Sequence, residues 1–152
     1  MDGLSLASGI FAVLSLTIEL TKIVHEYTTE VSHASASILD LERELNSLST
    51  VLQQLADLLE EHQDVGASFH DASVLCAAKD ACEAKIEYLC HRLKKQQNAQ
   101  GAMKIIRRLK WPFETRETRE IVESLRRCVQ TFELSLSIDN WYPSQVTEYV
   151  LY

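Results

Sequence analysis

The sequence predicts an all-α protein, a bundle of four to five helices with a long N-terminal helix. Three observations support this prediction. The 152 residues include only four glycines and two prolines, so helix-breaking residues are scarce. No window alternates with the period of a β-strand until the last few residues. One segment repeats leucine at the spacing of a seam between helices. A chain of this length is expected to form one domain with a substantial core.

The first predicted helix covers residues 4–30, and its first half is unusually apolar. No charged residue occurs between Gly3 and Ile18. Small residues recur there at helical spacing, and larger apolar residues fill the rest of the circumference; the small residues are Ser5, Ser8, Gly9, Ala12 and Ser15. A helix of this kind must be buried in a core, removed as a signal sequence or inserted into a membrane.

A cleaved signal is not expected, because no basic residue precedes Lys22 and the segment continues into an amphipathic helix. A permanent membrane anchor is not expected either, since about sixteen uncharged residues fall short of the ~20 needed to span a bilayer. Nor does Met-Asp open a myristoylation motif. We therefore expect a buried helix in the resting bundle. A sharper alternative adds its conditional release towards a membrane.

The second predicted helix has the clearest pattern. Its spacings alternate between three and four residues, which is a heptad seam, at Ile38, Leu41, Leu45, Leu48, Leu52, Leu55 and Leu59. Leu39, Val51 and Leu58 widen this stripe, as expected inside a multi-helix bundle. Ser32 and Ser35 offer N-cap chemistry before it, and residues 60–66 are the expected stop.

A third helix is expected from Asp71 or Ala72 to Gln97. Its core positions are Leu75, Cys82, Ile86, Leu89 and Leu93, with Ala78 as a small filler. A polar loop (98–101) and a short basic helix (102–110) follow, until Trp111-Pro112-Phe113 interrupts the pattern.

The last predicted helix begins at a cap formed by Thr115, with Thr118 as the alternative, and ends at Asp139-Asn140. The inward positions are Ile121, Leu125, Cys128, Phe132 and Leu136. These boundaries predict a helical bundle over residues 1–139 and a tail or linker over residues 140–152.

Charge is distributed unevenly along the chain, whose formal net charge is −7. No acidic residue lies between Glu87 and Glu114, and basic residues gather in that interval. Lys94, Lys95, Arg107 and Arg108 are therefore candidate contacts for anionic lipid or an acidic partner. The alternative is a solvated helix end that offsets the acidic first half. No nucleic-acid partner is expected.

The motifs of familiar enzyme chemistry are missing. There is no glycine-rich phosphate loop, no H-E-x-x-H and no G-x-S-x-G. Cys76, Cys82, Cys90 and Cys128 have no C-x-x-C spacing, so we read them as free core cysteines of a reducing compartment rather than as a zinc site. No catalytic, cofactor-binding or metal-binding residue is predicted, and the chain is expected not to be an enzyme.

Two stretches carry a family resemblance. The opening, MDGLSLASGIFAVLSLTIELTKIVHEYTTEVSHASASILDLERELNSLSTVLQQL, resembles the N-terminal HeLo-like domains of fungal STAND (NOD-like) receptors, although Gly3 stands where that group often has proline. The stretch from Leu109 to Phe113, with the helix after it, is similar to the K-W-P-F junction and closing helix of the same group. Together the two stretches cover most of residues 1–139.

The resemblance implies a signalling or effector domain of fungal innate immunity, of the kind involved in heterokaryon incompatibility and programmed cell death. It implies kinship with HeLo and mixed-lineage-kinase-like four-helix bundles, which act on membranes. It also implies a homo-oligomer on activation, a NOD-like receptor or fused nucleotide-binding domain as partner, and relocation from the cytoplasm to the plasma membrane. The membrane-active residues carried over are Leu4, Leu6, Gly9, Ile10, Phe11, Ala12, Leu14 and Ile18. The alternative function is a helical interaction or oligomerisation module without membrane activity.

Overall fold

The computed structural model describes residues 3–30, 34–61, 72–97 and 111–150, with side chains described between Leu6 and Ser137 except at positions 72, 73 and 97. These ranges hold four helices, α1 (Gly3–Glu30), α2 (Ala36–Glu61), α3 (Ala72–Gln97) and α5 (Thr115–Val150), and no strand. The predicted all-α fold with a long N-terminal helix is confirmed. The loop and short basic helix predicted over residues 98–110 lie outside the described residues.

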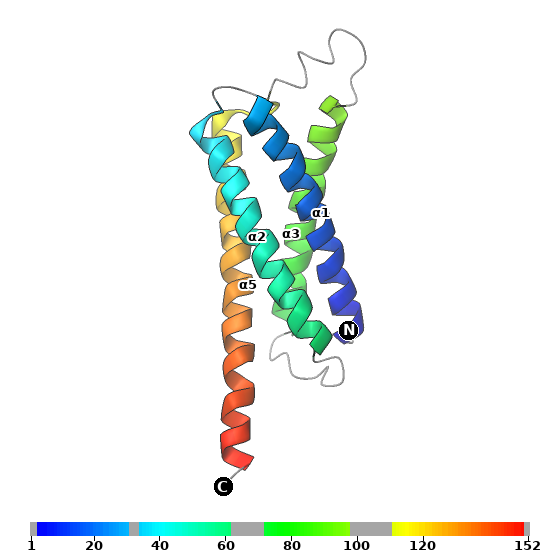
Figure 1. The fold of residues 1–152 in the computed structure, drawn as a ribbon, viewed down its shortest axis with the longest axis vertical. Helices are drawn as coiled ribbons and strands as arrows, with labels where there is room; N and C mark the ends of the chain where they lie inside the picture. Colours follow the sequence, from blue (N-terminus) through cyan, green and yellow to red (C-terminus); the bar gives the residue numbers. More distant parts are fainter. Residues whose placement is uncertain (1–2, 31–33, 62–71, 98–110, 151–152) are drawn as a thin grey trace.

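The helices form a bundle in which α1 and α3 run in one direction and α2 and α5 in the other (Figure 1). Helix α1 packs against α2 and α3, and α5 packs against the same two helices. Helices α1 and α5 therefore occupy opposite corners. The C-terminal end of α1 lies at the same end of the bundle as the start of α5 (Figure 1).

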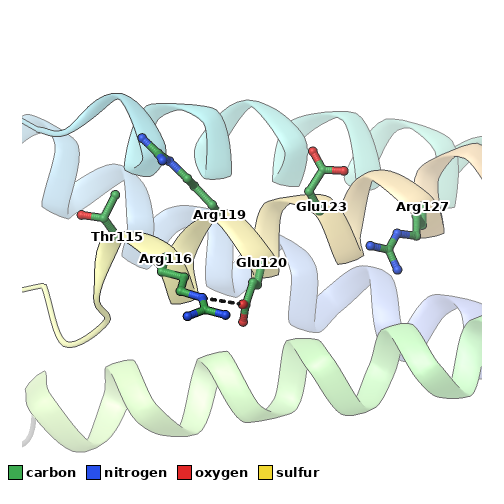
Figure 2. Close-up of a pocket in the computed structure, with 6 residues that line it drawn as sticks. All are labelled: Thr115, Arg116, Arg119, Glu120, Glu123 and Arg127. Atoms are coloured by element: carbon green, nitrogen blue, oxygen red, sulfur yellow. Dashed lines mark hydrogen bonds and ion pairs between the residues drawn. The ribbon is translucent and has the colours of Figure 1, made fainter.

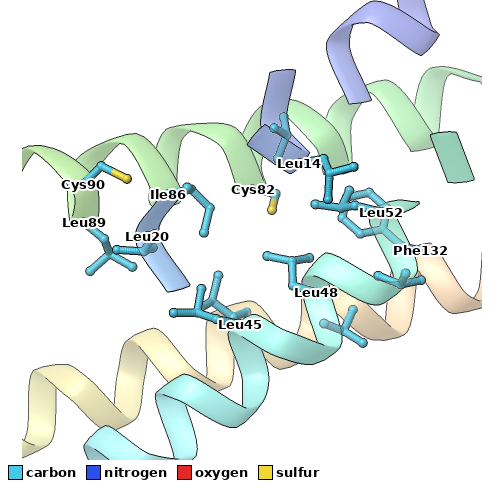
Figure 3. Close-up of a cluster of buried hydrophobic side chains, with 14 of the residues drawn as sticks. Leu14, Leu20, Leu45, Leu48, Leu52, Cys82, Ile86, Leu89, Cys90 and Phe132 are labelled. Carbon is cyan, nitrogen blue, oxygen red and sulfur yellow. The ribbon is translucent and has the colours of Figure 1, made fainter. Parts of the chain in front are cut away.

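The leucine seam of α2 lies at the centre of the core, as predicted. Its members from Leu41 to Leu55 are fully buried, and Leu59 is nearly so. Figure 3 shows Leu45, Leu48 and Leu52 of α2 together with Cys82, Ile86 and Leu89 of α3 and Phe132 of α5. Fully burying one leucine stabilises a fold by roughly 1.5–3 kcal/mol, so this seam is a large share of the driving force.

The predicted core faces of the other helices are confirmed too. In α3 the buried positions include Leu75, Cys82, Ile86, Leu89 and Leu93. In α5 Ile121, Leu125 and Phe132 are buried, while Cys128 and Leu136 are partly buried against the core. One of the residues expected to widen the stripe of α2 was assigned wrongly: Leu39 is 44% exposed. It follows Ile38 by one position, about 100° around the helix, and so faces away from the seam.

Two helix starts show how the sequence sets boundaries. Ser35 caps α2, because its Oγ accepts a hydrogen bond from the Ile38 amide at 3.4 Å. The predicted cap of α5 was wrong: Thr115 is the first helical residue, and the Glu114 carbonyl accepts the first amide bond from Thr118 at 2.9 Å. Thr118 is buried instead, where its hydroxyl donates to that carbonyl and accepts from the Trp111 indole.

The predicted end of the last helix at Asp139-Asn140 was also wrong. Helix α5 continues through Pro143 to Val150 and projects past the ends of the other helices (Figure 1). Asp and Asn permit a helix end but do not impose one, and extending an existing helix is far easier than starting one.

Candidate functional site

The uncharged half of α1 packs one face into the bundle. Leu6, Ile10 and Leu14 are buried, and Val13 joins them with no exposed surface. The expectation of a resting helix buried in the bundle therefore holds for these positions. The Leu4 side chain lies outside the described residues.

The opposite face of the same segment is solvent-exposed and uncharged. Phe11 is 38% exposed and Ile18 is 42% exposed. Ser8, Ala12 and Ser15 complete this outer face with small side chains. The expectation of a buried helix is wrong for Phe11, although Ile10 and Leu14 are buried. Large apolar residues surround the segment, so their pattern alone did not exclude Phe11 from the core, whereas Ser8, Ala12 and Ser15, small residues at helical spacing, lie on the outer face.

The hydroxyl groups of α1 make hydrogen bonds within the helix. Ser15 donates to the Phe11 carbonyl at 3.0 Å, Thr17 to the Val13 carbonyl at 2.7 Å and Thr21 to the Thr17 carbonyl at 2.6 Å. Such bonds to the preceding turn leave these donors satisfied without water. The free-energy cost of moving this helix from water to apolar surroundings is therefore lower than its serine and threonine content suggests.

By length and composition, Leu6–Glu30 is a candidate membrane span among the described residues, with a mean hydropathy of 1.6 over its most apolar window. In the bundle, 44% of that window is buried. The core helix of a soluble protein can have the same length and hydropathy. These two properties therefore make α1 compatible with either a protein core or a lipid bilayer.

Helix α3 covers one edge of α1 with Lys79. The Lys79 stem lies over Gly9, so a Cβ placed on that glycine would come within 3.0 Å of Lys79 Cδ and 3.1 Å of its Nζ. The Lys79 side chain is only 12% exposed, and its amine pairs with Asp80 at 2.8 Å. A hydrogen bond to Asp80 raises the pKa of Lys79, so the amine stays charged in this position.

Two more contacts between α1 and α3 lie further along the line where these two helices meet, called the α1–α3 seam below. Lys94 pairs with Glu19 at 2.6 Å, and its pKa is raised by that hydrogen bond. The Cys90 thiol donates to the Leu16 carbonyl at 3.8 Å. Four basic residues were predicted to contact anionic lipid or an acidic partner. Of these, Lys94 is paired with α1, Lys95 is exposed, and Arg107 and Arg108 lie outside the described residues.

The C-terminal half of α1 is held by aromatic contacts with the Trp111-Pro112-Phe113 junction. The Tyr27 and Trp111 rings meet edge-on with centroids 5.2 Å apart, and Trp111 contacts Phe113 at 5.5 Å. Trp111 also donates through Nε1 to Thr118 Oγ1 at 3.0 Å. This junction therefore ties α1 to the first turn of α5.

The same junction reaches α3 through a charged residue. Arg92 lies over the Phe113 ring at 5.1 Å and over the Tyr88 ring at 5.8 Å. Its guanidinium donates to the Tyr88 hydroxyl at 3.0 Å, and that hydroxyl donates to Glu117 at 3.3 Å. Sequence reasoning noted the W-P-F motif but not this role, because Tyr27, Tyr88 and Arg92 reach it only through the fold.

Two surface hollows border α5. The first lies along the start of α5 (Figure 2) and is lined by Thr115, Arg116, Arg119, Glu120, Glu123 and Arg127. It holds three arginines and two glutamates, and Arg116 pairs with Glu120 at 3.3 Å, as on an ordinary solvated helix. The second hollow lies between α2 and α5, beside Asp57, Glu61 and Leu136. Within the described ranges, no three His, Cys, Asp or Glu side chains gather as metal ligands do.

The cysteines fill core positions, and two of them interact. The Cys82 thiol of α3 is hydrogen-bonded to Cys128 of α5, which lowers the pKa of Cys128 and, together with burial, raises that of Cys82. Burial raises the pKa of Cys90 to about 11, with Glu19 acting in the same direction and Lys94 against it. All four cysteines are free thiols.

The chain matches a known protein family. The family model described as "Pigment biosynthesis cluster protein PigL N-terminal" matches residues 1–152. No curated protein and no solved structure matches the chain. Since the family match extends over the whole of the sequence, this helical bundle belongs to the PigL N-terminal domain family.

Proposed function

We propose that this domain is a non-catalytic signalling effector whose α1 helix acts on membranes after the domain self-associates. The proposal combines the resemblance to HeLo-like domains of fungal NOD-like receptors with the outer face of α1. The observation that carries it is that the uncharged first half of α1 exposes Phe11 and Ile18, while Ser15 and Thr17 bond their hydroxyls to the preceding turn of the helix. In this proposal the protein moves from the cytoplasm to the plasma membrane when a NOD-like receptor or fused nucleotide-binding domain clusters it.

Small residues support the self-association step. Ser8, Ala12 and Ser15 lie on the exposed face of α1, and small side chains allow helices to approach closely in lipid. The exposed Lys95 offers a contact for an anionic headgroup, worth about 1 kcal/mol near such a surface. Lys94 would contribute in the same way only after leaving Glu19.

Dye release from vesicles containing phosphatidylserine tests the proposal with the full chain. Phe11→Glu and Ile18→Glu place a carboxylate on the outer face of α1, and a charge at the membrane centre costs about 2.5–3.5 kcal/mol. Both positions are exposed, so each new carboxylate reaches water. Because Phe11 and Ile18 still bury part of their surface, circular dichroism first verifies that each variant is folded. We expect both variants to lose dye release.

Leu39→Glu and Val74→Glu are the matched controls, since these side chains are 44% and 50% exposed on α2 and α3. They should release dye as the unmodified protein does. If Phe11→Glu and Ile18→Glu release dye equally well, insertion of α1 is wrong.

The alternative is an interaction module that binds a partner or another copy without touching membranes. The buried inner face of α1 favours it, because Leu6, Ile10 and Leu14 already have a place in the core. A protein that self-associates in solution but never releases dye, whatever the lipid, would establish this alternative.

A further inference from the structure

Gly9 occupies a position that helix propensity alone does not explain. It lies inside α1, six residues from the first residue of that helix, where glycine is the least favourable residue apart from proline. A glycine in such a place usually marks a close approach by another group. Here that group is the stem and amine of Lys79, which fill the space where a Cβ would lie.

We propose that Lys79 is a latch that retains the first half of α1 in the bundle, and that Gly9 is the seat in which it closes. The inference rests on the proposed function, in which α1 must leave its place in the bundle. The latch identifies the contact that restrains the departure of α1 from the bundle. Gly9 lies between the exposed Ser8 and the buried Ile10, at the boundary between the surface and the core. Lys79 therefore covers this boundary, where α1 meets α3.

The latch differs from the rest of the contact between α1 and its neighbours. The inner face of α1 is held by apolar burial, which has no directional preference. Lys79 instead combines a methylene stem on Gly9 with a charged amine fixed by Asp80. Because that amine would lie 3.1 Å from a Cβ on residue 9, a charge introduced there acts directly on it.

A charge-exchange cycle tests the latch in solution, without membranes. Gly9→Lys places a second ammonium against Lys79, so amide hydrogen exchange over residues 6–14 should become several-fold faster. Adding Lys79→Glu to that variant restores an attractive pair, and exchange should return towards the unmodified rate. Gly9→Glu alone should slow exchange in the same segment, since its carboxylate can pair with Lys79.

Two references keep this test interpretable. Gly9→Ala adds the Cβ that the charged variants share, and Lys79 need move only a few tenths of an ångström to admit it. Exchange over residues 20–27 reports the part of α1 beyond the latch and should stay unchanged in every variant. The latch is overturned if Gly9→Lys and Gly9→Glu exchange alike, or if the second substitution restores nothing.

Lys79→Ala connects the latch to function, because it removes the stem and amine while leaving the sequence of α1 unaltered. We expect faster exchange over residues 6–14 together with several-fold greater dye release from phosphatidylserine vesicles. Faster exchange without any increase in dye release supports the latch and contradicts the membrane proposal. Unchanged exchange contradicts the latch itself, whatever the vesicles show.

Discussion

The two halves of α1 are attached to the bundle in different ways. The C-terminal half adds directional contacts to its apolar burial, namely Tyr27 against the Trp111 ring and His25 bonded to Glu42 at 2.5 Å. The uncharged half has apolar burial on one side, Lys79 on one edge and an open face carrying Phe11 and Ile18. A single helix can therefore be anchored to the bundle by its C-terminal half while its N-terminal half is free to leave the bundle.

Removing the aromatic anchor should have the largest effect. Trp111→Ala deletes the ring that contacts Tyr27 and Phe113 and leaves the Thr118 hydroxyl without its indole donor. We expect the free energy of unfolding to fall by about 4 kcal/mol, within the usual range for large aromatic residues. Urea denaturation measures this loss. Trp111→Phe, which keeps a ring but no N–H, should recover part of it; a loss below about 1 kcal/mol for Trp111→Ala would contradict an anchoring role.

Matched core truncations in the two halves come next. Leu20 and Ile10 are both fully buried, one in each half of α1. Leu20→Ala should cost about 3 kcal/mol of global stability. Ile10→Ala should cost less, about 1–2 kcal/mol, because a segment that opens locally cannot lose more than its own docking energy. Equal losses in urea denaturation would mean that α1 docks as one unit.

The smallest effect concerns the reactivity of Cys90 in the α1–α3 seam. Its thiol lies against the Leu16 carbonyl, and burial raises its pKa to about 11. Only the thiolate reacts, so iodoacetamide at pH 8 should modify Cys90 much more slowly than the partly exposed Cys128, whose pKa is lowered. Peptide mass spectrometry measures both rates.

In the Lys79→Ala variant the rate at Cys90 should stay unchanged, because its partner Leu16 lies beyond residues 6–14. The reaction at Cys128 should slow as the pH falls from 8 to 6, because protonation removes its thiolate. A Cys90 that reacts as fast as Cys128 in the unmodified protein would contradict a closed α1–α3 seam.

The helices were predictable from the sequence where periodicity is strong. The leucine seam from Leu41 to Leu59 identified the buried face of α2, and Ser35 was among the residues expected to cap that helix. Local signals misplaced both ends of α5, because Thr115 and Asp139-Asn140 have cap chemistry that the chain does not use there.

The candidate site was less predictable, for a physical reason. Large apolar residues surround the first half of α1, so their pattern alone does not separate the buried Ile10 from the exposed Phe11. The small residues at helical spacing, among them Ser8, Ala12 and Ser15, did mark the exposed face. Lys79 has the sequence character of a surface lysine, and its place on Gly9 depends on how α3 packs against α1. The one local signal of this contact was a glycine inside a helix, which indicates a close contact without naming the partner.

The central claim is that the first half of α1 opens separately from the rest of the bundle. Native-state hydrogen exchange of the unmodified full chain, measured on peptides over residues 6–14 and 20–27, tests it directly. The account predicts that residues 6–14 exchange through a local opening that is insensitive to low denaturant, while residues 20–27 exchange only with global unfolding. Identical opening free energies in both segments, each equal to the global value, would contradict it.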